Sequence, residues 1–437
     1  MGRYRQEDRS QGELNDEHSM ASQKSQTVKK RVDMESAGFH SGPLAGYRIL
    51  ELCSTIAGPA CGRIFADFGA EVIKIEPLEG DSVRSLGYHE GDVSLYAASI
   101  LRNKKSVAID IKSTQGRDLV LELVKQSDAL LENFRPGTLE RLGLDYETLS
   151  SLNPGLILIR ISGYGQDGPY SQKAGYGAIC EATAGVREMT GDPDRPPARV
   201  ALAMTDYMTA VYAALGGVMA LLAREKTGKG QIVDAALYES SFSMMESVIT
   251  AYDRLGVVPT RTGSRLQSTA PNNLYIASDG AYVLVTANND KVFARLANAM
   301  QRPELVQDPR FATIRDRATH VEDIDIEVGN WVSSLPARAV QEVLDTAGVP
   351  VAMVNRISDI FEDPHFRARQ MLVQVDHPTL NTLTMLGITP KLSSTPGEIR
   401  HVGPQLGADT CTVLRDTLGL SEQAIRALAE SNVIRTV

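Results

Sequence analysis

Cysteine is scarce in this sequence of 437 residues. The four cysteines, Cys53, Cys61, Cys180 and Cys411, are scattered and form no CxxC motif. This usage is typical of free thiols in a reducing compartment rather than of a disulfide framework, so we expect a cytoplasmic protein. The seven histidines form neither an HExxH motif nor a cluster with cysteine, and the sequence therefore predicts no metal site.

Long apolar runs and an excess of positive charge are missing as well. The longest apolar run, residues 210–223, is shorter than the roughly 20 residues that a membrane-spanning helix needs. The formal net charge of −9 argues against nucleic acid or an anionic membrane as the main partner. A local basic site for a phosphorylated ligand is compatible with this charge.

Several motifs that would announce a reaction class are absent. A dinucleotide site requires GxGxxG after the first strand, but residues 54–59 read STIAGP and contain one glycine. Neither the GxxxxGK[ST] loop nor the GxSxG nucleophile elbow occurs. Nicotinamide chemistry is therefore not expected, and the glycines at 163–168 indicate a tight loop, for which plain turn chemistry is an equally good interpretation.

The order of predicted elements indicates an α/β fold. Residues 1–43 are polar and mixed in charge, and we expect a disordered N-terminal extension. Beyond them, strands alternate with helix-length segments, which predicts a Rossmann-like parallel sheet covered on both faces. The expected strands are 47–53, 71–76, 106–111, 129–134, 156–162 and 231–237. Ligands of such sheets gather beyond the carboxyl ends of the strands.

Composition divides the chain further. Residues 44–256 form the predicted large domain, and a loop rich in Thr, Arg, Ser and Pro follows it. A strand at 281–286 and helices at 290–300 and 338–347 predict a smaller α+β domain over 257–355. The segment 356–437 is expected to return to the large domain and to end in the helices 409–418 and 421–430.

Asp206 stands at the start of the most conspicuous stretch, residues 201–241. The positions that follow it are apolar on every face of a helix, which is typical of a buried helix. A carboxylate at this helix N-terminus would be held ionised by the exposed N–H groups and the helix dipole. The local pattern alone favours a simpler interpretation, in which Thr205 or Asp206 caps the helix.

Several blocks taken together identify a family resemblance. In order, they are PLAGYRILEL (43–52), AGP (57–59), GAEVIKIE (69–76), NKKS (103–106), ENFRPG (132–137), NP (153–154), SGYG (162–165) and KTGKGQ (226–231). Each block is weak by itself, but their joint order and spacing resemble the family III CoA-transferases, the group of formyl-CoA transferase and carnitine CoA-transferase. The resemblance covers nearly everything from residue 43 onward.

The resemblance implies a fold, a partner and a mechanism. It implies an interlocked homodimer in which each chain has a large Rossmann-like domain and a small domain. It places Asp206 at the family's catalytic aspartate, which attacks an acyl-CoA thioester and forms a covalent aspartyl intermediate. Coenzyme A is then a substrate and product, the second substrate is a small carboxylic acid, and no permanently bound cofactor is expected.

The CoA-binding residues implied by the resemblance follow the matching blocks. Asn133 and Phe134 resemble the pair that lines the CoA channel, and Arg141 matches a phosphate-contacting arginine, a task that suits guanidinium. A solvated helix arginine is the alternative interpretation of Arg141. Ile109 and Lys112 match positions around the adenine and the 3′-phosphate. Lys173 approximately matches a lysine near the pyrophosphate.

Departures from the family pattern bear on the substrate. Formyl-CoA transferase has a glutamine where this chain has Ile56 and an arginine where it has Pro77, which argues against formate and oxalate. The glycine-run loop of the family is also absent from residues 263–273. We therefore expect a larger acid, for example a dicarboxylate such as succinate with its CoA ester. Its second carboxylate requires a cation, for which the sequence offers Arg63, Arg102, Arg187 and Arg199 without choosing among them.

Two other functions were weighed. The 2-methylacyl-CoA racemases share the fold and use a histidine in an Ala-Gly-His motif to move an α-proton. Here the motif reads Ala174-Gly175-Tyr176, and an unperturbed tyrosine is a poor base at neutral pH. Tyr176, with Ile56, is instead expected in the substrate pocket. A CoA-binding protein without catalysis would be favoured if the aspartate were missing, but Asp206 is present.

Overall fold

The computed structural model describes residues 42–266 and 268–437, so the predicted extension lies almost wholly outside the described residues. The chain divides into two compact units. The first comprises the described part of Met1–Tyr176 with Thr205–Ser240 and Val373–Val437, and the second comprises Gly177–Met204 with Ser241–Leu372. The expected small domain, 257–355, lies inside the second unit, which also includes residues 177–204, 241–256 and 356–372. Of the segment 356–437 that was expected to return to the large domain, only residues 373–437 do so.

The first unit is built on a sheet that, in the described residues, has seven strands in the order β14-β5-β2-β1-β6-β7-β8. The strands are β1 (Arg48–Leu52), β2 (Glu71–Glu76), β5 (Lys104–Ile109), β6 (Ala129–Glu132), β7 (Ile157–Ser162), β8 (Ile232–Ala236) and β14 (Ile434–Arg435). All neighbours are parallel except β14, which runs antiparallel to β5. The predicted α/β class with a parallel sheet is confirmed.

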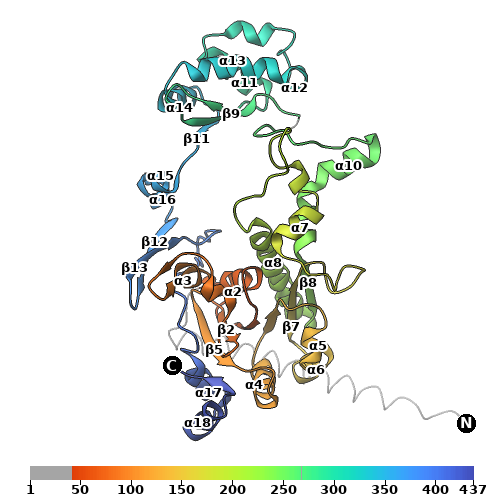
Figure 1. Ribbon diagram of the computed structural model, residues 1–437, viewed down its shortest axis with the longest axis vertical. Helices are drawn as coiled ribbons and strands as arrows, with labels where there is room; N and C mark the ends of the chain where they lie inside the picture. Colours follow the sequence, from red (N-terminus) through yellow and green to blue (C-terminus); the bar gives the residue numbers. More distant parts are fainter. Residues whose placement is uncertain (1–41, 267) are drawn as a thin grey trace, which may run out of the picture. The chain divides into compact units, whose positions relative to one another are not determined.

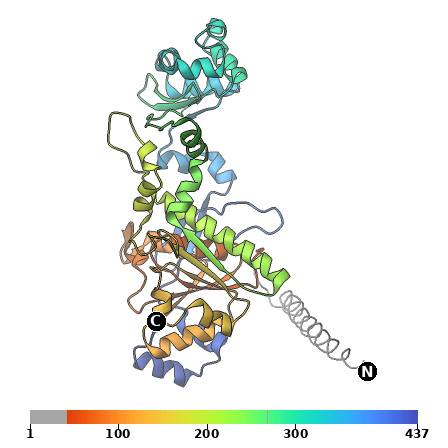
Figure 2. The ribbon, with the colours of Figure 1, turned by 90° about the vertical axis from the view of Figure 1, so that its right-hand side faces the viewer.

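Helices cover both faces of this sheet (Figures 1 and 2). One face carries α2 (Ala57–Asp67) and α8 (Met204–Thr227), and the other carries α4 (Thr114–Val124), α6 (Tyr146–Leu152), α17 (Thr410–Leu418) and α18 (Glu422–Glu430). Because side chains alternate along a strand, Leu50 and Leu52 of β1 pack toward α4 and α17 while Ile49 points to the opposite face. Both faces of each central strand are therefore buried, as the alternation of strands with helix-length segments predicted.

Helix α2 lies unusually close to β1 because two of its positions have no side chain. A Cβ atom at Gly58 would lie 2.3 Å from Cys53 Sγ, and one at Gly62 would lie 1.8 Å from Glu51 Oε2. Both distances are far below contact, so only glycine permits this approach. The start of α2 is thereby held over the carboxyl end of β1.

The expectation that α8 is buried on all sides is wrong. Its small residues, including Ala210, Ala213 and Gly217, pack against the sheet, where a Cβ at Gly217 would meet Ile159 and Phe65. An opposite stripe is exposed: Val211, Leu215, Met219 and Leu222 are 57%, 47%, 58% and 61% accessible. Within residues 42–266 and 268–437, one apolar face of α8 is buried against the sheet and the opposite face is exposed.

By length and composition alone, α8 is also apolar enough to cross a membrane, contrary to the estimate from the run 210–223. A core helix passes the same test, and α8 contributes its small-residue face to the core of the first unit.

The second unit is an α+β body, as predicted for the smaller domain. Its antiparallel sheet has the order β11-β10-β9, formed by Val351–Met353, Tyr282–Thr286 and Asn272–Ile276. The helices α11 (Asp290–Ala299), α13 (Val321–Ser333) and α14 (Ala337–Thr346) pack on it. At its centre Arg317 is fully buried, where it donates to the carbonyl oxygens of Ala270 and Phe311 and pairs with Asp290.

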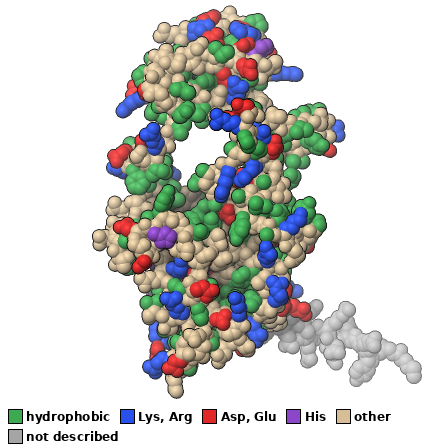
Figure 3. Space-filling model, in the orientation of Figure 1, with side chains coloured by type: hydrophobic (Ala, Val, Ile, Leu, Met, Phe, Trp, Pro, Cys, Tyr) green, Lys and Arg blue, Asp and Glu red, His purple; other side chains and the backbone are tan. Residues whose placement is uncertain are grey.

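Shorter elements complete the two units. They are β3 (His89–Glu90), β4 (Val93–Ser94), α3 (Leu95–Ile100), α5 (Thr138–Arg141), α7 (Gly177–Thr183), α9 (Leu237–Phe242), α10 (Glu246–Leu255), α12 (Ile314–Thr319), α15 (Ile357–Glu362), α16 (Pro364–Ala368), β12 (Leu372–His377) and β13 (Asn381–Leu386). On the face shown in Figure 3, Lys and Arg side chains are interspersed with Asp and Glu.

Candidate active site

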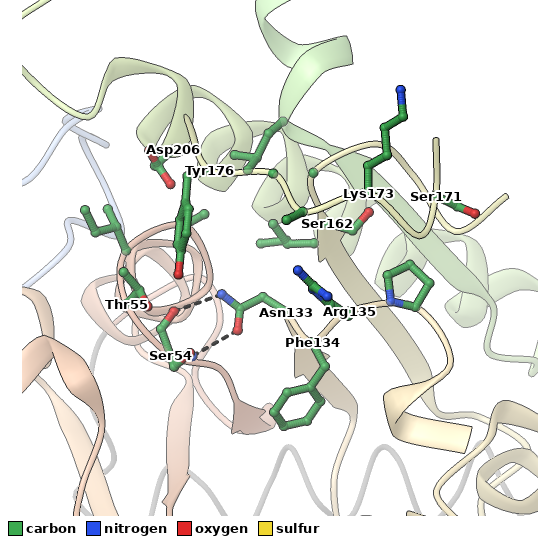
Figure 4. Close-up of a pocket in the computed structure, with 18 residues that line it drawn as sticks. Ser54, Thr55, Asn133, Phe134, Arg135, Ser162, Ser171, Lys173, Tyr176 and Asp206 are labelled. Carbon is green, nitrogen blue, oxygen red and sulfur yellow. Dashed lines mark hydrogen bonds between the residues drawn. The ribbon is translucent and has the colours of Figure 1, made fainter. Parts of the chain in front are cut away.

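A pocket of about 210 Å³ opens beyond the carboxyl ends of β1, β6 and β7, entirely within the first unit (Figure 4). This is the edge of the sheet where the strand order predicted a ligand. The lining residues are Ser54, Thr55, Ile56, Ala57, Asn133, Phe134, Arg135, Pro136, Ile161, Ser162, Gly163, Ser171, Lys173, Ala174, Gly175, Tyr176, Asp206 and Leu237.

The β1–α2 loop forms one wall of the pocket and is held from two sides. Asn133 Oδ1 accepts the Ser54 N–H at 2.9 Å, and Asn133 Nδ2 donates to the Ser54 carbonyl oxygen at 2.8 Å. Figure 4 shows this pair of bonds as dashed lines. Thr55 adopts a left-handed φ of 70°, which is strained for a β-branched residue, and its N–H donates to Asp81 Oδ1 at 3.0 Å.

A buried charge network supports that loop from the core. Lys74 Nζ lies 2.8 Å from Asp81 Oδ2 and 3.1 Å from Glu51 Oε1, and it donates to the Cys53 carbonyl oxygen at 2.7 Å. Lys104 Nζ lies 2.7 Å from Glu51 Oε2. Burial alone would lower the pKa of Lys74, but the charges of Glu51 and Asp81 raise it above its usual range. Two ammonium groups thus balance two carboxylates beneath the pocket.

The end of β6 is held in a similar way. Glu132 is fully buried, and its carboxylate accepts from Arg160 Nε at 2.6 Å and from the Phe134 N–H at 2.7 Å. Burial raises the pKa of Glu132 although Arg160 opposes the rise. The charge of Arg160 and the carboxylate of Glu132 fix the turn that presents Asn133 and Phe134 to the pocket.

The loop after β7 forms a third wall of the pocket. Gly165 and Gly168 have left-handed φ values of 88° and 78°, and a Cβ at Gly163 would lie 3.0 Å from Gly175 Cα. The glycines therefore allow the loop to turn tightly and the segment 174–176 to lie against it. Lys173, which is exposed, places its Nζ 3.3 Å from the centroid of the Tyr170 ring.

Asp206 is the acidic residue in the first turn of α8 and lies at the margin of the pocket. The first turn of a helix carries unpaired N–H groups and the positive end of the helix dipole, an environment that favours negative charge in general. Figure 4 shows the Tyr176 ring extending from the side of Asp206 toward Ser54 and Asn133. The arrangement places the carboxyl group of Asp206 in a small pocket that has two cationic side chains, Arg135 and Lys173, in its wall.

The structure brings most of the predicted site residues together. Six of them line this pocket: Asp206, Ile56, Tyr176, Asn133, Phe134 and Lys173. Three of the predicted CoA-binding residues do not. Lys112 and Arg141 are exposed on the segments that follow β5 and β6, and Arg141 donates to Thr138 Oγ1 at 2.8 Å. The Ile109 side chain is fully buried in the core. A ligand at this position could therefore contact only the backbone of Ile109 or the neighbouring residues.

The four candidate arginines differ in their ion pairs and in the unit to which they belong. Arg102 is fully engaged by Asp67, at 2.6 Å, and by the Leu386 carbonyl oxygen, while Arg187 pairs with Glu181 at 3.1 Å. Arg187 and Arg199 belong to the second unit. Arg63 lies in the first unit, and no described residue pairs with it as a salt-bridge partner.

Sequence reasoning missed the residues that position the site. Local sequence patterns do not reveal these residues, because each contacts a segment elsewhere in the chain. They are Asp81, Lys74, Glu132 and Arg160. The one available signal was the occurrence of charged residues inside otherwise apolar strands, as in β2 and β7. In residues 42–266 and 268–437, no group of three or more His, Cys, Asp or Glu side chains could hold a metal ion.

Fold and site define the class: an α/β protein with a pocket at the carboxyl edge of a parallel sheet, beside an acid on a helix N-terminal turn. The sequence matches CoA-transferase family III over residues 44–410. The chain belongs to this family and is a CoA-transferase, which confirms the resemblance found in the sequence blocks.

Its relatives extend over nearly the whole chain. It is 45% identical over 394 residues to succinyl-CoA–D-citramalate CoA-transferase of Chloroflexus aurantiacus, covering 90% of this chain and 98% of that one. It is 41% identical over 398 residues to the beta subunit of succinyl-CoA–L-malate CoA-transferase of the same organism, with 90% and 98% covered. The crystal structure of a CAIB/BAIF family protein from Brucella suis superposes with a TM-score of 0.76 at 31% identity, covering 86% of this chain and 100% of that one.

Proposed function

We propose that the protein transfers CoA from succinyl-CoA to a second dicarboxylate through a covalent intermediate on Asp206. The observation that carries the proposal is the place of Asp206 in the pocket, on the first turn of α8. The two relatives described above use succinyl-CoA with D-citramalate or L-malate, both of which are dicarboxylates. Free thiols at all four cysteines accord with work in the cytoplasm.

The proposed reaction proceeds by four acyl exchanges. An oxygen of Asp206 attacks the thioester carbon, the C–S bond breaks, and CoA leaves as a thiolate. The thiolate then attacks the Asp206 carbonyl of this anhydride and releases the donor acid. The acceptor carboxylate attacks the aspartyl thioester and frees the thiolate again. The thiolate finally attacks the acceptor's acyl carbon, which restores Asp206 and yields the new CoA ester. Each step exchanges one acyl bond for another, so no large barrier arises from a single difficult displacement.

The pocket walls suit a thioester of this kind. Gly163, Gly175 and Ala57 leave space beside Asp206, and Lys173 and Arg135 supply positive charge for an anionic ligand. We propose that Asn133 and Phe134 line the path of the CoA chain. Lys112 and Arg141, which follow neighbouring strands at the same edge of the sheet, are then available to its phosphates.

We also propose that two chains form the interlocked homodimer that the resemblance implies. The exposed stripe of α8, formed by Val211, Leu215, Met219 and Leu222, is a surface that a second copy would bury. Linked chains cannot separate while folded, so analytical ultracentrifugation should find a dimer at every dilution. A folded monomer at low concentration would contradict this arrangement.

The test of the proposed function is a paired substitution at Asp206. Asp206→Asn keeps the size and the hydrogen-bonding capacity of the side chain but removes the nucleophile. We expect it to lose CoA transfer between succinyl-CoA and malate or citramalate by about 10³-fold or more, as removal of a catalytic nucleophile does, while CoA still binds. Near-normal turnover, with deamidation excluded by mass spectrometry, would contradict the assignment.

A further inference from the structure

Arg63 carries a positive charge that the fold leaves without an anion. It lies on α2, partly buried, and its Nε has no hydrogen-bond partner although it is shielded from solvent. Burial and the nearby charge of Arg102 lower the pKa of Arg63, yet a guanidinium stays protonated at neutral pH. A shielded, unpaired charge is unfavourable, so such a group is usually paired in the functional state.

Asp67, a carboxylate whose charge acts on Arg63, is already occupied. Asp67 lies one helical turn beyond Arg63, but its oxygens accept from Arg102 at 2.6 to 3.2 Å and from Asn103 at 2.8 Å. Asp67 and Arg102 therefore neutralise each other. Among the described residues Arg63 therefore has no salt-bridge partner.

The geometry of α2 places Arg63 on the same helix face as a residue of the pocket, although Arg63 itself does not line the pocket. Ile56, which lines the pocket, precedes it by seven residues, so the two share a helix face about 10 Å apart along the axis. Helical side chains lean toward the N-terminus, which brings the guanidinium back along that face toward Ile56. There it lies 5.8 Å from the centroid of the Tyr207 ring, the residue that follows Asp206.

A pair of tyrosine hydroxyls lies near both this cation and Asp206. Tyr96 and Tyr207 bond to each other at 2.9 Å through their hydroxyl oxygens. Burial and the Tyr207 hydroxyl raise the pKa of Tyr96, and the charges of both Asp206 and Arg63 reach it. The pair has two protons and uses one for its mutual bond, so one O–H is left to donate to an anion.

We propose that Arg63 binds the remote carboxylate of the dicarboxylate substrate, with the free hydroxyl proton of the Tyr96–Tyr207 pair as its second donor. This inference rests on the proposed function, because the reacting carboxyl group must lie at Asp206. It makes Arg63 a specificity-determining residue: a guanidinium matches a carboxylate with two parallel hydrogen bonds, whereas an uncharged end group would leave it unpaired.

The test compares substrates that differ only in the remote group. Succinate and its monoamide, succinamate, have nearly the same shape, but only succinate has the second charge. With acetyl-CoA as a donor that lacks a remote carboxylate, we expect the wild-type enzyme to prefer succinate in kcat/KM by at least about tenfold. Arg63→Gln should abolish most of this preference by raising the KM for succinate, with little change for succinamate.

Two further variants keep the test decisive. Arg117→Gln removes a positive charge from α4, where Arg117 pairs with Asp118 at 2.9 Å, and it should leave the preference unchanged. Arg63→Lys keeps the charge but loses the bidentate geometry, so it should retain part of the preference for succinate. If Arg63→Gln does not fold, the preference measured with Arg63→Lys tests the inference instead. The inference would be overturned if the variants lost kcat/KM equally for succinate and succinamate. It would also be overturned if Arg63→Lys and Arg63→Gln both kept the preference for succinate. In either case CoA transfer by the wild-type enzyme would still stand. Absence of CoA transfer to any acid by the wild-type enzyme would instead refute the proposed function.

Discussion

Asp81 accepts the backbone N–H of Thr55 at 3.0 Å while its other carboxylate oxygen lies 2.8 Å from Lys74 Nζ. A buried ion pair thus holds a residue with left-handed φ in the wall of the pocket. The strain at Thr55, of order 1–3 kcal/mol, persists because the core around it is fixed by charge and hydrogen bonding. The buried Asp81–Lys74 pair thus fixes the conformation of the loop that forms one wall of the pocket.

The first prediction concerns this ion pair. Asp81→Asn keeps the acceptor for Thr55 but turns an amide N–H₂ toward the ammonium of Lys74. We expect the free energy of unfolding to fall by about 3 kcal/mol, since one partner of a buried pair is lost. Urea unfolding followed by circular dichroism measures the change. Asp118→Asn on exposed α4 is the control, and equal midpoints for the two variants would contradict the prediction.

Asn133 is expected to act on binding as well as on stability. Asn133→Ala breaks both bonds to Ser54, which should lower the free energy of unfolding by about 1–2 kcal/mol and raise the KM for the CoA ester severalfold. Asn153 is a matched control because its Nδ2 donates to the Val124 and Ser127 carbonyl oxygens, away from the pocket. Asn153→Ala should cost similar stability at unchanged KM. A KM that rises equally in both variants would count against a role of Asn133 in the pocket.

Acid stability should report on Glu76. Burial alone would raise the pKa of Glu76, but Arg84 and Lys74 lower it to about 2 from the unfolded value of 4.5. A carboxyl group with a lowered pKa stabilises the fold above the unfolded value and loses this effect as the pH falls through the folded value. The difference in unfolding free energy between wild type and Glu76→Gln should therefore be largest above pH 4.5 and shrink toward pH 2. The gap, about 3 kcal/mol at most, follows from the size of the shift. Glu90→Gln, at an exposed position, should show no such trend, and a pH-independent gap for Glu76→Gln would refute the argument.

Tyr176 separates CoA transfer from racemisation. A racemase must exchange the α-proton of a 2-methylacyl-CoA with solvent, whereas attack at the thioester carbonyl leaves that carbon untouched. Tyr176 is 71% exposed in the pocket wall. We expect no enzyme-dependent deuterium incorporation in deuterated water by mass spectrometry. Incorporation that disappears in Tyr176→Phe would make Tyr176 and Asp206 an acid–base pair.

Much of the architecture was accessible from the sequence, since alternating strands and helices are local patterns. The strand predicted at 71–76 coincides with β2, and six predicted site residues meet in one pocket because each follows a strand or begins a helix. Pairings between distant segments were not accessible. Nothing near Arg102 indicates that Asp67 neutralises it, and therefore the sequence could not single out Arg63 among the four arginines. The exposed stripe of α8 was missed for a related reason: an apolar residue pattern predicts burial on every face, but it does not show which face the chain itself buries.

The covalent role of Asp206 is tested most directly by following oxygen. In the proposed sequence, an oxygen of the acceptor carboxylate remains on Asp206 when the thiolate takes the acyl group, and an oxygen of Asp206 leaves with the donor acid. Turnover of succinyl-CoA with malate labelled with heavy oxygen in its carboxylates should therefore label Asp206. Trypsin releases residues 200–224, a peptide in which Asp206 is the one acidic side chain. We predict that its mass rises by one oxygen exchange in a single turnover and by two after many. An unlabelled peptide after many turnovers would contradict the covalent mechanism.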